Sequence, residues 1–305
     1  MGFTKEFNKL VTEERNERTM DLDTLDTLEL VERVQAEDFE VAKAVQQVVP
    51  DIAKAIDIIT ERLRGGGRMF YFGAGTSGRL GVLDAAECVP TFGIEKDMVQ
   101  ALIAGGRDAM FQSYEDAEDQ NELGVKDATQ AKVTEKDVVI GISSSGRTPY
   151  VIGALTYSKE QGAAVVSIVN NPDSTLSTFS DVTIAALVGP EALTGSTRMK
   201  SGTAQKMILN LLSTCTMVRL GKVYENLMID LKPTNYKLRE RAVSIISILG
   251  DVPRQLAEGA LVASHDKSKT AILMMKRKLG RAQAEELITR CGGSLRKALV
   301  AETNQ

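Results

Sequence analysis

Apolar residues along this chain of 305 residues recur with a helical period in its first part. Residues 24–49 carry Val31, Val34 and Val41 on one stripe, and residues 51–64 repeat the pattern. Pro50 separates the two segments, and a run of three glycines at 65–67 ends the second. The first 20 residues are highly charged and predict irregular structure. We therefore predict an N-terminal helical segment over residues 1–50.

The period then changes to short apolar runs that predict strands. The runs are rich in Val and Ile, and helical patterns near 79–88, 108–121 and 148–161 separate the first four of them. Strands that alternate with helices predict an α/β fold, with a parallel sheet covered on both faces in an αβα sandwich. We assign this domain to residues 51–245, with strands at 68–72, 99–104, 137–142, 163–169 and 182–188.

The pattern becomes wholly helical from about residue 245. Three short helices are predicted at 251–263, 268–279 and 281–300, and Gly292-Gly293 falls inside the last. The sequence therefore predicts a small C-terminal three-helix domain over residues 246–305.

Composition narrows the function classes. A net charge of −4 and a pI near 5.4 argue against nucleic acid as the main partner. The chain has no apolar run of membrane-spanning length, and its N-terminus lacks the apolar core of a signal peptide, so we expect a cytoplasmic protein away from membranes. The three widely spaced cysteines predict thiols in a reducing compartment. One histidine excludes a His-based triad or a multi-His metal site, so we expect no metal.

The Gly73–Arg79 stretch is the first of three loops rich in glycine and hydroxyl groups. It lies between a predicted strand and a predicted helix, where backbone N–H groups and the hydroxyls of Thr76 and Ser77 can bind an anion. Gly75 permits close approach of a ligand. The letters fit G-x-G-x-x-G, but no acidic residue follows the next strand, so a dinucleotide site and a plain tight turn both remain alternatives.

Two further loops have the same character. Ser144, Ser145, Arg147 and Thr148 follow the third predicted strand, and Thr194–Thr203 precedes a long helix that ends near Arg219. Hydroxyl residues before a helix often serve as caps. Parallel strands, however, bring such loops to one edge of the sheet, where ligands bind, so three of them together favour a ligand site.

Two carboxylates occupy apolar helix faces. Glu87 follows Leu80 and Leu83 at helical spacing, near the end of a helix that is predicted to stop before Pro90. Desolvation and the helix dipole would both favour its protonated form, which suits a general acid. Glu118 follows Phe111 and Tyr114 in the same way. A structural ion pair, for example of Glu87 with Arg79, remains the alternative for both.

Long stretches of the chain resemble one family. The runs Gly73–Gly93, Leu102–Gly106, Ser145–Tyr150 and above all Gly189–Lys206 closely resemble the N-acetylmuramic acid 6-phosphate etherases. The last run also resembles the signature of the animal glucokinase regulatory protein. The similarity extends from about Thr24 to the last helix. The second loop departs from the family pattern at Ser143-Ser144, which makes Ser145 the firmer phosphate ligand.

The resemblance implies a sugar isomerase (SIS) domain that binds a phosphosugar, a small helical domain and a homodimer. It implies cleavage of the lactyl ether of N-acetylmuramic acid 6-phosphate to N-acetylglucosamine 6-phosphate and D-lactate, in the recycling of peptidoglycan sugars, without a cofactor. Ser196 and Lys206 in the third signature join the candidate substrate ligands.

The resemblance also places the family's catalytic glutamates at Glu87 and Glu118. Elimination across C2 and C3 followed by addition of water needs only an acid and a base. We expect Glu87 to protonate the departing lactyl oxygen and Glu118 to transfer the C2 proton, although the roles can be exchanged. A non-catalytic phosphosugar sensor, like the regulatory protein, and an aldose–ketose isomerase are the alternatives.

Overall fold

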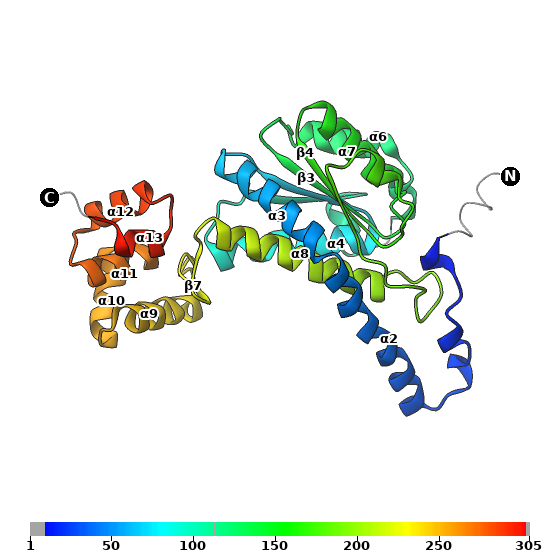
Figure 1. Cartoon of the computed structure of the whole chain (residues 1–305), viewed down its shortest axis with the longest axis horizontal. Helices are drawn as coiled ribbons and strands as arrows, with labels where there is room; N and C mark the ends of the chain where they lie inside the picture. Colours follow the sequence, from blue (N-terminus) through cyan, green and yellow to red (C-terminus); the bar gives the residue numbers. More distant parts are fainter. Residues whose placement is uncertain (1–9, 113, 303–305) are drawn as a thin grey trace. The chain divides into compact units, whose positions relative to one another are not determined.

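The computed structural model describes residues 10–112 and 114–302 (Figure 1). The chain forms two compact units, the first made of Met1–Ala85 with Asp97–Ser213, and the second of Ala86–Lys96 with Thr214–Gln305. Helix α4 (Gly75–Phe92) begins in the first unit and ends in the second. The division predicted from the sequence, with boundaries after residues 50 and 245, stays a prediction.

The first unit is built on a parallel sheet, as predicted. Its order is β2-β1-β3-β4-β5, and every neighbouring pair runs parallel. β1, β3 and β4 are buried along their whole length, as expected for strands covered on both faces. The strands are β1 (Met69–Gly73), β2 (Val99–Ile103), β3 (Val138–Ser143), β4 (Ala164–Val169) and β5 (Val182–Ala185).

Alternate strand residues face two helical layers. Phe70 and Phe72 belong to the buried cluster that includes Val151 of α7 (Pro149–Glu160), and α6 (Asn121–Gln130) packs on α7. Tyr71 points to the other face, where a Cβ on Gly81 of α4 would lie 3.0 Å from the Tyr71 Cβ. Figure 1 shows α6 and α7 on one side of the sheet, with α3 (Val49–Arg64) and α8 (Lys200–Arg219) on the other.

The N-terminal segment is tied to the first unit by a buried carboxylate. Three 3-10 turns, Val11–Glu13, Glu17–Thr19 and Leu22–Thr24, precede α2 (Thr27–Gln47) and α3 (Val49–Arg64). On α2, Glu37 is 3% exposed and accepts hydrogen bonds from Lys200 Nζ at 2.7 Å and Asn16 Nδ2 at 2.7 Å. Pro50 lies in the first turn of α3, where its missing N–H is harmless.

Two predicted helices differ from the structure. The helix predicted over 108–121 is wrong, because a 3-10 turn at Arg107–Met110 and a short α5 (Glu115–Glu118) occupy this region. Conversely, α4 continues through Pro90 to Phe92. It ends before Gly93, whose φ of +61° and close approach to the Asp230 carbonyl leave no space for a side chain.

The second unit has more helices than predicted. After a small hairpin of β6 (Val223–Tyr224) and β7 (Leu227–Met228), the chain forms α9 (Tyr236–Gly250), α10 (Arg254–Ala263), α11 (Ser268–Arg277), α12 (Arg281–Arg290) and α13 (Leu295–Val300). The three-helix prediction missed α9 and joined α12 to α13. Gly292 and Gly293, with φ of +64° and +80°, break the predicted helix there. Within residues 10–112 and 114–302, no helix is long and apolar enough to span a bilayer.

Candidate active site

The first loop makes a tight turn from β1 into α4. A Cβ on Gly78 would lie 2.7 Å from the Gly73 carbonyl oxygen, so the helix starts almost against the strand end. Gly75 has a φ of +50° and is exposed at the first position of α4. Thr76 lies against the third loop, because a Cβ on Gly202 would be 3.3 Å from its Cγ2. The first and third loops therefore lie side by side. This agrees with the prediction that a parallel sheet brings these loops to one of its edges.

Gln205 of α8 joins the first two loops. The Ser77 hydroxyl donates to Gln205 Oε1 at 2.8 Å, and Gln205 Nε2 donates to Ser144 Oγ at 2.9 Å and to Asn170 Oδ1 at 2.9 Å. All four residues are buried. Ser77 and Ser144 are thus brought together, but their hydroxyls are engaged with a protein amide. Gln205 and Asn170 were not predicted, and the long signature that includes Gln205 was the one available signal.

The second loop presents hydroxyl groups at the start of α7. Ser143 Oγ lies 2.8 Å from Thr148 Oγ1 and 3.4 Å from Ser145 Oγ. Thr148 is the N-cap residue of α7, yet its side chain makes no capping hydrogen bond. Ser145, Arg147 and Thr148 are half-buried, so the loop has one side that a ligand can reach. A helix N-terminus flanked by hydroxyls and an arginine can bind a phosphate group.

The third loop differs from the second because its helix already holds an anion. The carboxylate of Glu191, which is fully buried, accepts from the Lys200 N–H at 2.8 Å and the Ser201 N–H at 2.9 Å. The N-terminus of α8 is thereby neutralised from within. Ser196 is half-buried in the turn before it, and Lys206 is exposed on α8.

Asp84 is a buried carboxylate that the sequence reasoning missed. Its oxygens accept from Tyr71 Oη at 2.9 Å, Asn210 Nδ2 at 3.0 Å and Ser213 Oγ at 2.9 Å, which joins α4 to β1 and α8. Burial raises the pKa of Asp84, while these hydrogen bonds and the charge of Lys206 oppose the rise. Lys206 therefore lies within electrostatic range of this carboxylate.

The two candidate catalytic glutamates are exposed. Glu87 lies on α4 beside Leu83, which is 49% exposed, whereas the buried face of that helix carries Asp84, Ala85 and Cys88. Glu118 is exposed at the end of α5. Among the residues that the structure describes, neither carboxylate lies on a buried apolar face, so that expectation is wrong. Glu87 falls in the second unit and Glu118 in the first.

Metal-ligating groups do not cluster in the part of the chain that the structure describes. Among residues 10–112 and 114–302, no group of three or more His, Cys, Asp or Glu side chains has the arrangement of a metal site. Cys88, Cys215 and Cys291 are thiols in the described structure rather than disulfide partners.

Two family models match parts of this chain. Residues 51–159 match the glucokinase regulatory protein N-terminal SIS domain, and residues 116–214 match the SIS domain. A putative phosphosugar isomerase involved in capsule formation from Bacteroides fragilis has a similar structure, with 24% identity, a TM-score of 0.48, and coverage of 62% of this chain and 91% of that one.

Two curated relatives match nearly the whole chain. N-acetylmuramic acid 6-phosphate etherase 2 of Vibrio cholerae is 51% identical over 290 residues, which cover 95% of this chain and 94% of the relative. The Clostridioides difficile etherase is 50% identical over 295 residues, with 97% of both chains covered. Similarity of this extent leads to one conclusion: the chain belongs to the N-acetylmuramic acid 6-phosphate etherase family.

Proposed function

We propose that this protein cleaves the D-lactyl ether of N-acetylmuramic acid 6-phosphate and releases N-acetylglucosamine 6-phosphate and D-lactate. The observation that carries the proposal is identity of about half the residues over nearly the full length of the curated etherases. Such an activity recycles sugars of the cell wall. It belongs in the cytoplasm, where the thiol state of the three cysteines is expected.

The substrate phosphate is assigned to the second loop. Ser145 and Thr148 place hydroxyls at the N-terminus of α7, and Arg147 adds a cationic group beside them. Ser144 contributes indirectly, since its oxygen accepts from Gln205. Gly75, Thr76 and Ser77 of the first loop, with Ser196 and Lys206 of the third, are assigned to the sugar.

The reaction is a syn or anti elimination followed by hydration. Opening of the sugar ring exposes an aldehyde at C1, which acidifies the C2 proton. Glu118 removes that proton, the C3–O bond breaks, and Glu87 protonates the departing lactyl oxygen. Water then adds to C3, with Glu87 as the base and a proton returned to C2. Atoms balance without an added oxidant or metal.

Isotope incorporation tests this function directly. Purified protein is incubated with N-acetylmuramic acid 6-phosphate in H₂¹⁸O, and both products are analysed by mass spectrometry. Label in N-acetylglucosamine 6-phosphate, with none in D-lactate, is expected from cleavage of the C3–O bond. Label in lactate would overturn the mechanism.

A phosphosugar sensor is the second candidate. The match of residues 51–159 to the domain of a regulatory protein is the observation in its favour. In the same incubation a sensor would bind the phosphosugar and release no product. The released lactate therefore separates the two functions.

We also propose that the protein is a homodimer. Leu28, Val31 and Phe39 are 67%, 59% and 66% exposed and follow one stripe of α2, which is an apolar surface that a second copy can cover. Light scattering is expected to give twice the chain mass for wild type and Asp38→Ala, and the single-chain mass for Phe39→Asp. A single-chain mass for the wild-type protein would contradict the proposed dimer and would leave the proposed activity unaffected.

A further inference from the structure

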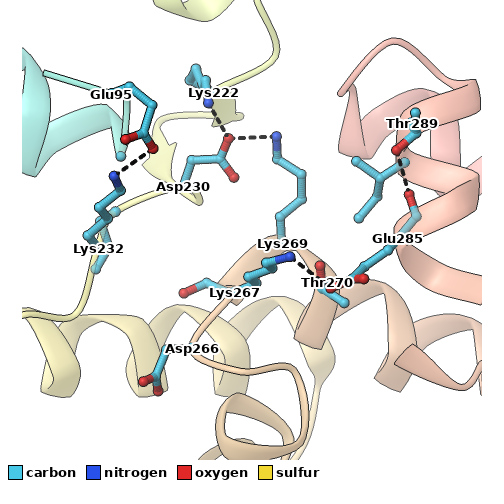
Figure 2. Close-up of a pocket in the computed structure, with 14 residues that line it drawn as sticks. Glu95, Lys222, Asp230, Lys232, Asp266, Lys267, Lys269, Thr270, Glu285 and Thr289 are labelled. Atoms are coloured by element: carbon cyan, nitrogen blue, oxygen red, sulfur yellow. Dashed lines mark hydrogen bonds and ion pairs between the residues drawn. The ribbon is translucent and has the colours of Figure 1, made fainter. Parts of the chain in front are cut away.

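The second unit contains a cavity of about 500 Å³ that lies outside the proposed active site (Figure 2). All residues that line it belong to this unit. Its volume falls within the range of sites for small metabolites. Its walls are unusually rich in charge, with the side chains of Lys222, Lys232, Lys267 and Lys269 beside those of Glu95, Asp230, Asp266 and Glu285.

The N-terminus of α11 opens into this cavity. Its first three residues, Ser268, Lys269 and Thr270, all line the cavity and are 2%, 7% and 3% exposed. The N-cap position is Lys267, which makes no capping hydrogen bond and whose side chain has no acceptor atom. The first-turn N–H groups of an α-helix have no acceptor within the helix. This terminus therefore favours an anion.

The Ser268 hydroxyl is an independent sign of a ligand. Its Oγ is buried and has no hydrogen-bond partner in the described structure. Side chains in the first turn of a helix lean toward the helix N-terminus, which here is the cavity end. A buried hydroxyl without a hydrogen-bond partner is destabilising unless a bound ligand supplies that partner.

Two lysines beside this terminus share a single carboxylate, although the lining as a whole carries four lysines and four acidic residues. Lys269 Nζ and Lys222 Nζ lie 2.7 Å and 3.2 Å from the same oxygen, Oδ2 of Asp230, so one carboxylate serves two ammonium groups (Figure 2). Lys269 Nζ also donates to the Gly293 carbonyl oxygen at 2.8 Å. Each ammonium has three donors, so these contacts leave one donor on Lys269 and further donors on Lys222 for a ligand. Burial lowers the pKa of Lys269, which a bound anion would offset.

We propose that this cavity binds a small phosphorylated metabolite, with its phosphate at the N-terminus of α11. A phosphate group can accept from the first-turn N–H groups, the Ser268 hydroxyl, Lys222 and Lys269 together, which is more donors than a carboxylate can satisfy. Glu285, Asp266 and Thr289 line the remainder of the cavity and provide acceptors for the hydroxyls of a sugar or polyol. The residues that line this cavity include none of those assigned to the proposed substrate site.

Equilibrium dialysis of the full-length protein against radiolabelled inorganic phosphate tests this inference. We expect two phosphates bound per wild-type chain. Lys222→Met and Ser268→Ala should each weaken one of them at least tenfold without loss of etherase activity. Asp230 keeps Lys269 in the first variant, so the fold is retained, and an unchanged melting temperature verifies this. Lys276→Met, at the exposed far end of α11, is the matched control and should bind as wild type.

A Ser145→Ala/Thr148→Ala variant tests the phosphate assignment at the second loop separately from the site at α11. It should lose the other phosphate and retain the one at α11. If it retains both while Lys222→Met loses one, the active-site assignment fails and this inference stands. If Lys222→Met and Ser268→Ala bind phosphate as wild type does, the inference is wrong. Displacement of the α11 phosphate by equimolar acetate would also overturn a phosphate-specific site.

Discussion

The hydroxyl of Ser77 donates a hydrogen bond of 2.8 Å to Gln205 Oε1, across 128 positions of sequence. Through the other end of the same amide, Gln205 also donates to Ser144 and Asn170. One fully buried side chain therefore sets the spacing of the first two loops and of the end of β4. We infer that Gln205 positions the loops of the active site without itself contacting the reacting atoms.

Replacement of this amide should affect both stability and turnover. Gln205→Ala leaves buried polar partners unsatisfied, which costs about 1–3 kcal/mol for a lost partner. Displacement of the loops should lower kcat/KM by up to about a hundredfold. Calorimetry and steady-state kinetics measure the two effects, and Gln130→Ala on the exposed end of α6 is the control. A normal kcat/KM in a less stable Gln205→Ala protein would show that the amide is merely structural.

The buried pair of Lys200 and Glu37 should be costly to break. Glu37→Gln leaves the Lys200 ammonium, which is 1% exposed, without its carboxylate. Removal of one member of a buried ion pair typically costs about 3–5 kcal/mol. The double variant Glu37→Leu/Lys200→Met removes both charges and should recover much of the loss. Thermal unfolding compares the two proteins, and a double variant less stable than Glu37→Gln would contradict this account.

The same carboxylate should contribute a pH dependence. Hydrogen bonds from Arg18, Lys200 and Asn16 outweigh burial and lower the pKa of Glu37 from 4.5 to about 2. Because the folded pKa is lowered, the stabilisation is complete above pH 4.5 and is lost as the pH falls toward 2. The difference in unfolding free energy between wild type and Glu37→Gln should therefore shrink below pH 4.5. A constant difference down to pH 3 would exclude this linkage.

Asp84 should show the opposite dependence. Burial raises its pKa above the ordinary value of 3.8, so the folded protein holds this proton more strongly than the unfolded chain does. Its contribution therefore becomes less favourable as the pH rises through the folded pKa. We expect Asp84→Asn to gain stability relative to wild type with rising pH, measured by thermal unfolding across pH 4 to 8. A pH-independent difference for Asp84→Asn would be inconsistent with the raised pKa.

The sheet could be predicted from the sequence because its signal is local. Residues 138–142 contain no polar side chain, and that pattern is sufficient to place a buried parallel strand. The helix over 108–121 failed for a tertiary reason. Phe111 has helical spacing to Glu118, yet it is 87% exposed, so no core selects a long helix there.

The loops of the candidate site could be predicted from the sequence, but the side-chain hydrogen bonds that join them could not. Loops rich in glycine and hydroxyl residues that follow parallel strands indicate an anion site, because ligands bind at the carboxyl ends of such strands. Gln205 reaches Asn170 across 35 residues and Ser144 across 61, and no periodicity records such contacts. The exposure of Glu87 could not be predicted either. Helical spacing shows which residues share a helix face, but it does not show whether that face is buried.

The two glutamates should separate in their effects on the two halves of the reaction. Glu87→Gln and Glu118→Gln should each lower kcat by about 10²–10⁴-fold, the usual contribution of a general acid or base. The Glu87 side chain is exposed, so Glu87→Gln should not alter the melting temperature. Glu122→Gln, one helix further along the chain, is the control and should retain wild-type kcat.

Exchange of the C2 proton identifies which glutamate removes that proton and which protonates the departing lactyl oxygen. In D₂O, proton NMR of N-acetylmuramic acid 6-phosphate should show loss of the C2 signal with Glu87→Gln, because Glu118 still removes that proton while the C3–O bond stays intact. Glu118→Gln should show neither exchange nor lactate release. The reverse pattern would exchange the two roles, since the base is the residue whose loss stops exchange. Exchange at the wild-type rate in both variants would assign the C2 proton to another group and leave Glu87 and Glu118 without the chemistry proposed for them.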